Sequence, residues 1–221
     1  AVWKFSVPWA TYLQKTGDLE FVRTNFSIIR ARTHTIAADR TGPGGIMGRS
    51  IDIDTLGYWT ADNWAALLGL SSYKYLADAM GDAAESSWAT SEYDALFEAI
   101  DAQIAQTTSS FGLTYIPCSP LRPNEQNKCS VARNSNWMAL SIIGGWAWDG
   151  FLWGARQDGT MLDLLDATYD YGFGRLAGDL PPHTYGGFGG PPEYSSAYTA
   201  GCGLSGLRGE RYRSEALLDY L

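Results

Sequence analysis

Three acidic residues stand where they could share one reaction centre. Asp62, Asp149 and Glu193 each lie near the start of a predicted helix and have aromatic neighbours, which are Trp59, Trp64, Trp146, Trp148, Tyr194 and Tyr198. A single acid in a first helical turn has a plainer explanation, because it complements the helix dipole by ~0.3–1 kcal/mol. Three such acids on one rim indicate instead a site where one carboxyl donates a proton and another accepts one.

The elements that would bring these acids together are paired helices. Short glycine turns alternate with long loops; the turns lie at Gly17, Gly81, Gly159 and Gly209, and the loops at 34–58, 109–136 and 172–192. This alternation is typical of repeated αα-hairpins whose long loops share one face. Helices are expected at 8–14, 19–33, 60–80, 146–155, 161–171, 193–207 and from 210 to the end. One more helix is expected to follow the turn at Gly81 and to end near residue 106. We therefore expect an all-α fold, an (α/α) toroid of helical hairpins, with at most a strand fragment near 113–116.

The stretch Gly144–Ala155 organises this expected fold. Its two leading glycines break whatever precedes them, and the large apolar residues that follow have no charged neighbours except Asp149. Such a run predicts a helix that is buried on most sides. Burying Asp149 would be costly unless it has a partner or an open end. We place Asp149 in the first turn of an inner helix, facing a cavity, and this favours a closed toroid.

Composition narrows the possible partners. The 221 residues suit a single domain, 1–221, and 45% are hydrophobic while only 18% are charged. A net charge of −8 without a basic run makes nucleic acid and anionic membranes poor partners. No apolar run reaches the ~18 residues of a membrane span.

Neither a metal nor an organic cofactor is expected. The two histidines, His34 and His183, both lie in predicted long loops, and two isolated imidazoles do not make a metal site. Either could still donate a hydrogen bond to a substrate. No glycine-rich phosphate loop follows a predicted strand.

Cys118 and Cys129 bracket a short polar loop rich in proline. Such a loop could close as a disulfide and stabilise the fold by a few kcal/mol, and two free thiols are the alternative. A disulfide favours an oxidising compartment, so a secreted or periplasmic location is expected. Cys202 lies among small residues and is expected to be buried and free.

Three segments resemble the six-hairpin glycosidase superfamily: Pro8–Val22, Tyr58–Trp64 and Trp146–Gly150. Glucoamylases, trehalases and related glycoside hydrolases of this superfamily share an (α/α)6 barrel. Only four hairpins are visible in this chain where six are expected. The resemblance therefore implies a partial barrel, and a chain that belongs to a larger protein or assembly.

The resemblance also implies hydrolysis of an extracellular oligo- or polysaccharide by two carboxylates. Asp149 and Glu193 are the expected pair, and a separation of ~6.5–9.5 Å would leave room for the water of an inverting reaction. Glu193 would be the base and Asp149 the acid, or the reverse, because the helix dipole favours ionised Asp149. The expected sugar-binding residues are Asp52, Asp54, Trp59, Asp62, Trp64, Trp146, Trp148, His183 and Tyr194.

Two other classes of protein stay open. A non-catalytic toroid that binds glycans or builds an extracellular assembly would carry the same aromatic rim without a competent acid pair. A terpenoid cyclase is the other class, because Asp52-Ile53-Asp54-Thr55 resembles the acidic motif that protonates an isoprenoid. An aromatic lining would suit a carbocation, but no Gln-Trp repeats accompany the motif. The plainer reading of these two acids is a solvated loop in which Arg49 pairs with one of them.

Overall fold

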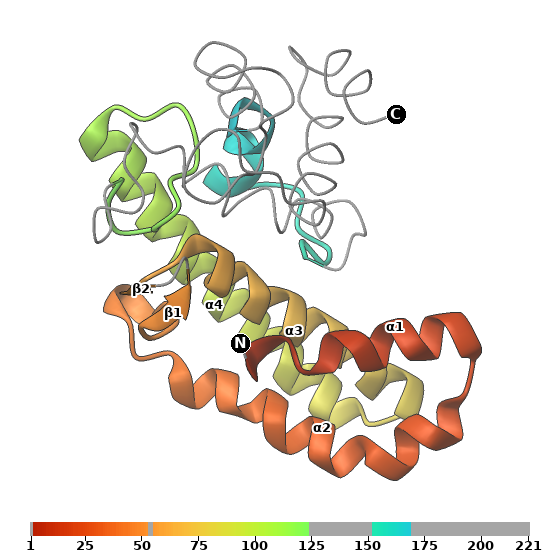
Figure 1. The fold of residues 1–221 in the computed structure, drawn as a ribbon. Coiled ribbons are helices and arrows are strands. Elements are labelled where there is room, and N and C mark those ends of the chain that lie inside the picture. Colours follow the sequence, from red (N-terminus) through yellow and green to blue (C-terminus); the bar gives the residue numbers. More distant parts are fainter. Residues whose placement is uncertain (1, 53–54, 124–151, 169–221) are drawn as a thin grey trace, which may run out of the picture.

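The computed structural model describes residues 2–52, 55–123 and 152–168 (Figure 1). These residues are mostly helical, with one small two-stranded sheet, so the expected all-α class is confirmed for this part of the chain. Closure of the helices into a toroid stays a prediction. The elements are η1 (Val2–Lys4), α1 (Ser6–Thr16), α2 (Leu19–Asp39), η2 (Pro43–Gly45), β1 (Ser50–Asp52), β2 (Thr55–Gly57), α3 (Thr60–Met80) and α4 (Ala83–Phe111). Residues 160–168 are also helical.

Helices α1 and α2 form one αα-hairpin, and α3 and α4 form a second. In each hairpin the turn between the two helices is a glycine followed by an aspartate. Gly17 ends α1 at φ 69° and Gly81 ends α3 at φ 72°, a left-handed conformation that glycine adopts without steric cost. The next residue then caps the following helix. The Asp18 carboxylate accepts from the Phe21 N–H at 3.0 Å, and Asp82 does the same for Glu85 at 3.1 Å. Both predicted tight turns are confirmed.

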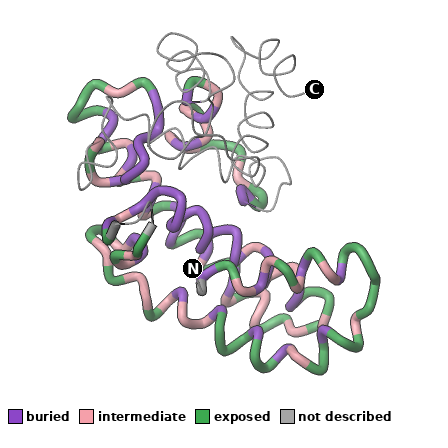
Figure 2. The backbone as a smooth tube through the Cα atoms, viewed as in Figure 1, coloured by how far each residue is buried: buried purple, intermediate pink, exposed green. Residues whose placement is uncertain are grey.

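Helix α3 is the centre of the described fold. Every residue from 60 to 70 is buried, as the purple run along α3 in Figure 2 shows, and α3 packs against α1, α2 and α4. Residues 152–168 also pack on it, since the Trp153 ring meets the Trp64 ring edge-on at 5.1 Å. A helix that is apolar on all sides is expected in an inner position, covered by its neighbours.

The predicted inner helix at 146–155 lies mostly outside the described residues. Its described end, 152–155, forms a turn, so the expected extension of the helix to Ala155 is wrong. Gly154 has a φ of 54°, which breaks helical geometry, and the Leu152 carbonyl accepts from the Tyr93 hydroxyl at 2.7 Å. The return helix, expected from Met161, is present in residues 160–168.

The first long loop is shorter than predicted because α2 continues to Asp39. The apolar stripe of α2, formed by Val22, Phe26 and Ile29, goes on through buried Thr33 and Ile36. This burial keeps the polar residues between them helical. His34, expected in the loop, is therefore part of α2. Helix α4 likewise runs past the expected end at 106 to Phe111.

The small sheet is not where the sequence predicted a strand. Strands β1 and β2 pair antiparallel inside the first long connection, with Ile51 opposite Leu56. Residues 113–116, the expected strand fragment, form no strand. The Leu113 N–H instead bonds the Thr108 carbonyl across left-handed Gly112, which closes the end of α4.

Gly69 is the point of closest approach between η1 and α3. A Cβ added to Gly69 would overlap the backbone carbonyl oxygen of Trp3, and the Gly69 carbonyl already accepts from the Ser6 hydroxyl at 2.5 Å. Gly→Ala inside a helix ordinarily stabilises by about 1 kcal/mol. Here we expect Gly69→Ala to lower the free energy of unfolding by about 1–3 kcal/mol, because backbone atoms must separate.

Urea unfolding of the Gly69→Ala variant measures this effect. Ser27→Ala, an exposed position on α2, is the control and should change stability by less than about 0.5 kcal/mol. A stabilised Gly69→Ala variant would contradict the close packing of η1 on α3.

None of the described helices is both long and apolar enough to cross a bilayer.

Candidate functional site

The first turn of α3 holds the described ends of two long connections together. Its Thr60 N–H donates to the Cys118 carbonyl at 2.7 Å, and its Thr60 hydroxyl donates to the Pro117 carbonyl at 2.7 Å. Both bonds reach the segment that follows α4. The second long connection therefore starts against the N-terminal end of α3.

The first long connection is held by the same turn. The Trp59 indole N–H donates to the Ser50 carbonyl at 3.1 Å, and the Ser50 hydroxyl donates to Asp62 Oδ2 at 2.5 Å. One residue further on, Asn63 Oδ1 accepts from the Met47 N–H at 2.9 Å. Three side chains at the start of α3, from the N-cap Trp59 to Asn63, thus fix the segment that leads into β1.

Asp62 is the expected site residue that this geometry describes best. It lies in the first turn of α3 and is only 9% exposed. Chemically, Asp62 is a nearly buried acceptor that can hold a hydroxyl group.

Asp62 does not cap α3, since the N-cap is Trp59 and makes no side-chain cap bond. From residue type alone, Thr60 or Asp62 would be predicted to cap this helix. That prediction is wrong, because the Thr60 hydroxyl donates to the Pro117 carbonyl.

Trp59 and Trp64 were expected to stack on a sugar, and both side chains are fully buried. Trp64 packs on Trp153, and its indole N–H points at the Met161 sulfur at 3.3 Å. Contact with a substrate would require the side chains around these rings to move. In the structure, both residues contribute to the core beneath the junction of the two connections.

Most of the other expected site residues lie outside the described residues. They are Asp54, Trp146, Trp148, Asp149, His183, Glu193 and Tyr194. The side chain of Asp52 is likewise not described, although its backbone forms the end of β1. Arg49, considered as a partner for these loop acids, donates to the Leu56 carbonyl at 3.2 Å. The pairing of Asp149 with Glu193 stays a prediction.

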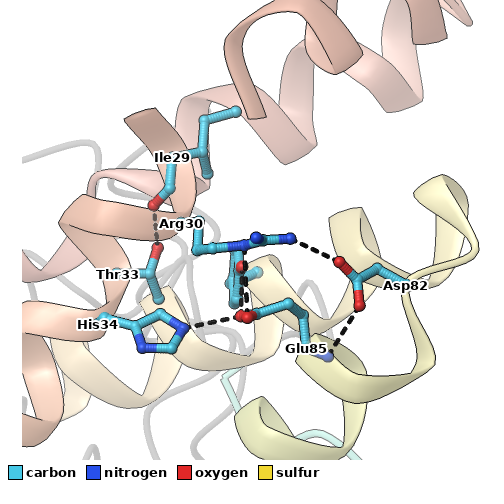
Figure 3. A network of polar contacts seen from close by, with 7 residues as sticks. Ile29, Arg30, Thr33, His34, Asp82 and Glu85 are labelled. Carbon is cyan, nitrogen blue, oxygen red and sulfur yellow. Dashed lines mark hydrogen bonds and ion pairs between the residues drawn. The ribbon is translucent and has the colours of Figure 1, made fainter. Parts of the chain in front are cut away.

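A second polar cluster, missed in the sequence, ties α2 to α3 and α4. Figure 3 shows Arg30 and His34 of α2 facing Glu85 of α4. His34 Nε2 donates to Glu85 Oε2 at 2.7 Å, the Tyr73 hydroxyl donates to the same oxygen at 2.7 Å, and Arg30 Nε lies 3.4 Å from Oε1. Arg30 also pairs with Asp82 at 2.6 Å. Both Glu85 oxygens are thus engaged, which indicates a structural tie.

The ionisation of this cluster follows from its contacts. Burial alone would raise the pKa of Glu85. The hydrogen bonds from His34 and Tyr73, with the charges of His34 and Arg30, outweigh burial and lower that pKa. Burial first, and then the bond to Glu85, raise the pKa of Tyr73 far above its ordinary value, so Tyr73 stays a neutral donor. The His34 ring also stacks on Trp88 with centroids 3.7 Å apart.

The sequence held one signal of this cluster. Arg30 and His34 are four residues apart, so they share one face of α2. Two basic side chains on one face of α2 predict an acidic partner on a neighbouring element. Only the tertiary fold shows that this partner is Glu85. No group of three or more His, Cys, Asp or Glu side chains that could hold a metal occurs within residues 2–52, 55–123 and 152–168.

No protein-family model matches this sequence, and neither the curated proteins nor the solved structures provide a match.

The Cys118–Cys129 disulfide stays a prediction, because Cys129 lies outside the described residues. Cys118 itself is fully buried beside α3. We expect alkylation in denaturant without reductant to label one of the three cysteines, Cys202, and intact mass measures the number of labels. Reduction before alkylation is the control and should give all three. Three labels without reductant would contradict the bridge.

Proposed function

We propose that the protein hydrolyses glycosidic bonds of an extracellular oligo- or polysaccharide, with Asp149 and Glu193 as the two carboxylates. The described hairpins would then belong to a partial (α/α)6 barrel. The observation that carries the proposal is the junction at the first turn of α3. There, both described long connections bond the N-terminal end of the central helix α3, next to a nearly buried carboxylate, Asp62.

The chemistry proposed for this end needs one protonated and one ionised carboxyl group. The acid protonates the leaving oxygen, and the base removes a proton from the water that attacks the sugar carbon. In the proposal, Asp149 starts another inner helix and Glu193 follows a glycine-rich loop, so both would face the same mouth as Asp62. The resemblance of Pro8–Val22, Tyr58–Trp64 and Trp146–Gly150 to six-hairpin glycosidases supports the same assignment.

The test is hydrolysis of a panel of soluble polysaccharides, measured by the release of reducing ends. Asp149→Asn and Glu193→Gln should each abolish turnover while binding of the active polysaccharide persists. Asp158→Asn, at an exposed acid shortly before the helical residues 160–168, is the matched control and should keep full activity. Binding without turnover in the wild-type protein would replace the hydrolase by the non-catalytic glycan-binding function.

A further inference from the structure

The β1–β2 hairpin is too small to hold its own position. Each strand has three residues, and isolated two-stranded hairpins are at best marginally stable in water. Its central pair does not anchor it either. Ile51 and Leu56 lie opposite each other and point to the same side, where they are 77% and 45% exposed. Burial of apolar surface therefore contributes little to fixing this hairpin.

Polar contacts at the base of the hairpin hold it instead. Ser50, the first residue of β1, makes two hydrogen bonds to the start of α3. Its hydroxyl donates to Asp62 Oδ2 at 2.5 Å, and its carbonyl accepts from the indole N–H of the N-cap Trp59 at 3.1 Å. Trp59 is fully buried and Asp62 nearly so, which means that both partners are themselves fixed by packing. Losing a hydrogen bond to a nearly buried carboxyl group costs stability, because that group is left without one of its partners.

We propose that Asp62 is a positioning residue, which fixes the β1–β2 hairpin through Ser50 as a rigid rim of the glycan site. The rim part of this inference rests on the proposed function, and the positioning part does not. This role differs from the sugar contact expected from the sequence. Asp62 Oδ2 is already bonded to Ser50, and the residue is only 9% exposed, so little of its carboxyl group is open to a sugar hydroxyl.

Hydrogen exchange of the amides of Ser50–Asp52 and Thr55–Gly57 tests the positioning. Ser50→Ala removes one hydroxyl at a half-buried site and keeps the backbone bond to Trp59, so the chain should still fold. We expect these amides to exchange about tenfold faster or more in this variant, while amides of α3 and α4 are unaffected. Ser27→Ala on exposed α2 is the matched control and should exchange like the wild-type protein.

Two outcomes overturn the positioning role. Unchanged exchange in Ser50→Ala means that the hydroxyl bond does not hold the hairpin. Faster exchange throughout the described helices means that the bond supports the whole fold rather than this element. Asp62→Asn, if it folds, should repeat the Ser50→Ala pattern, and the double variant should add little to either single change.

A second arm tests the rim with the polysaccharide that the wild-type protein hydrolyses. A loosened rim should raise KM about three- to tenfold in Ser50→Ala and leave kcat within about twofold, because the reacting carboxylates are untouched. If Ser50→Ala exchanges its hairpin amides faster but keeps the wild-type KM, the hairpin is not a rim of the glycan site. Absence of any hydrolysis by the wild-type protein overturns the proposed function and the rim together, whereas the exchange result still decides the positioning of the hairpin.

Discussion

Replacing Trp64 by alanine is expected to lower the free energy of unfolding by about 3–5 kcal/mol. The Trp64 side chain is fully buried in α3, packs edge-on against Trp153 and directs its indole N–H at the Met161 sulfur. Alanine would leave a cavity between α3 and residues 152–168, and the surrounding helices can close it only in part. Urea unfolding followed by circular dichroism measures the loss.

Two further variants make this prediction specific. Trp64→Phe keeps an aromatic ring, so it should lose less stability than Trp64→Ala. Phe21→Ala removes a ring that is 48% exposed and should cost clearly less than the change at Trp64. If Trp64→Ala instead kept its stability and lost only glycan binding, the residue would be a substrate contact, as the sequence analysis expected, and its core role would be wrong.

The sequence predicted those features of the fold that depend on local chemistry. Both Gly-Asp turns, at Gly17 and Gly81, follow from backbone freedom at glycine and from capping by the next aspartate. The start of a helix near Thr60 was also correct. The end of α2 was not, because Thr33 and Ile36 are helical through burial against other helices. No short window of sequence contains that information.

The candidate site was predicted in part for the same reason. Asp62 was correctly placed in the first turn of a helix, but its partner Ser50 was not identified, since a serine in a loop carries no signal of a contact. Trp64 was expected at a rim, whereas α3 is buried on every side around it. A sequence shows that an aromatic residue is near an acid, but not on which side of the helix its ring lies.

The Glu85 cluster shows the limit most clearly, since its members come from three helices. Arg30 and His34 belong to α2, Tyr73 to α3 and Glu85 to α4, and only packing of the two hairpins brings them together. Measuring how much this cluster contributes to stability therefore tests how the two hairpins pack against each other.

Replacing Glu85 by alanine is expected to lower the free energy of unfolding by about 2–3 kcal/mol near pH 7. The buried Tyr73 hydroxyl loses its acceptor, and bonds to charged groups are worth about 1.5–3 kcal/mol. Glu85→Gln should cost less, because the amide oxygen still accepts a hydrogen bond. Glu20→Ala is the control: its pair with Arg23 is exposed, so removing it should cost less than about 1 kcal/mol.

The pH dependence gives this prediction its sign. The pKa of Glu85 is lower in the folded protein than in the unfolded chain, where a glutamate titrates near ~4.3. The unfolded chain therefore takes up the proton first as pH falls, and the stability contributed by ionised Glu85 is fully present above about pH 5. It is lost as pH falls through the folded pKa.

The stability gap between the wild-type protein and Glu85→Gln, measured by urea unfolding from pH 7 to pH 3, should thus be constant above about pH 5 and shrink below it. A gap that widens on acidification would contradict the ionised, hydrogen-bonded Glu85 on which the tie between the two hairpins depends.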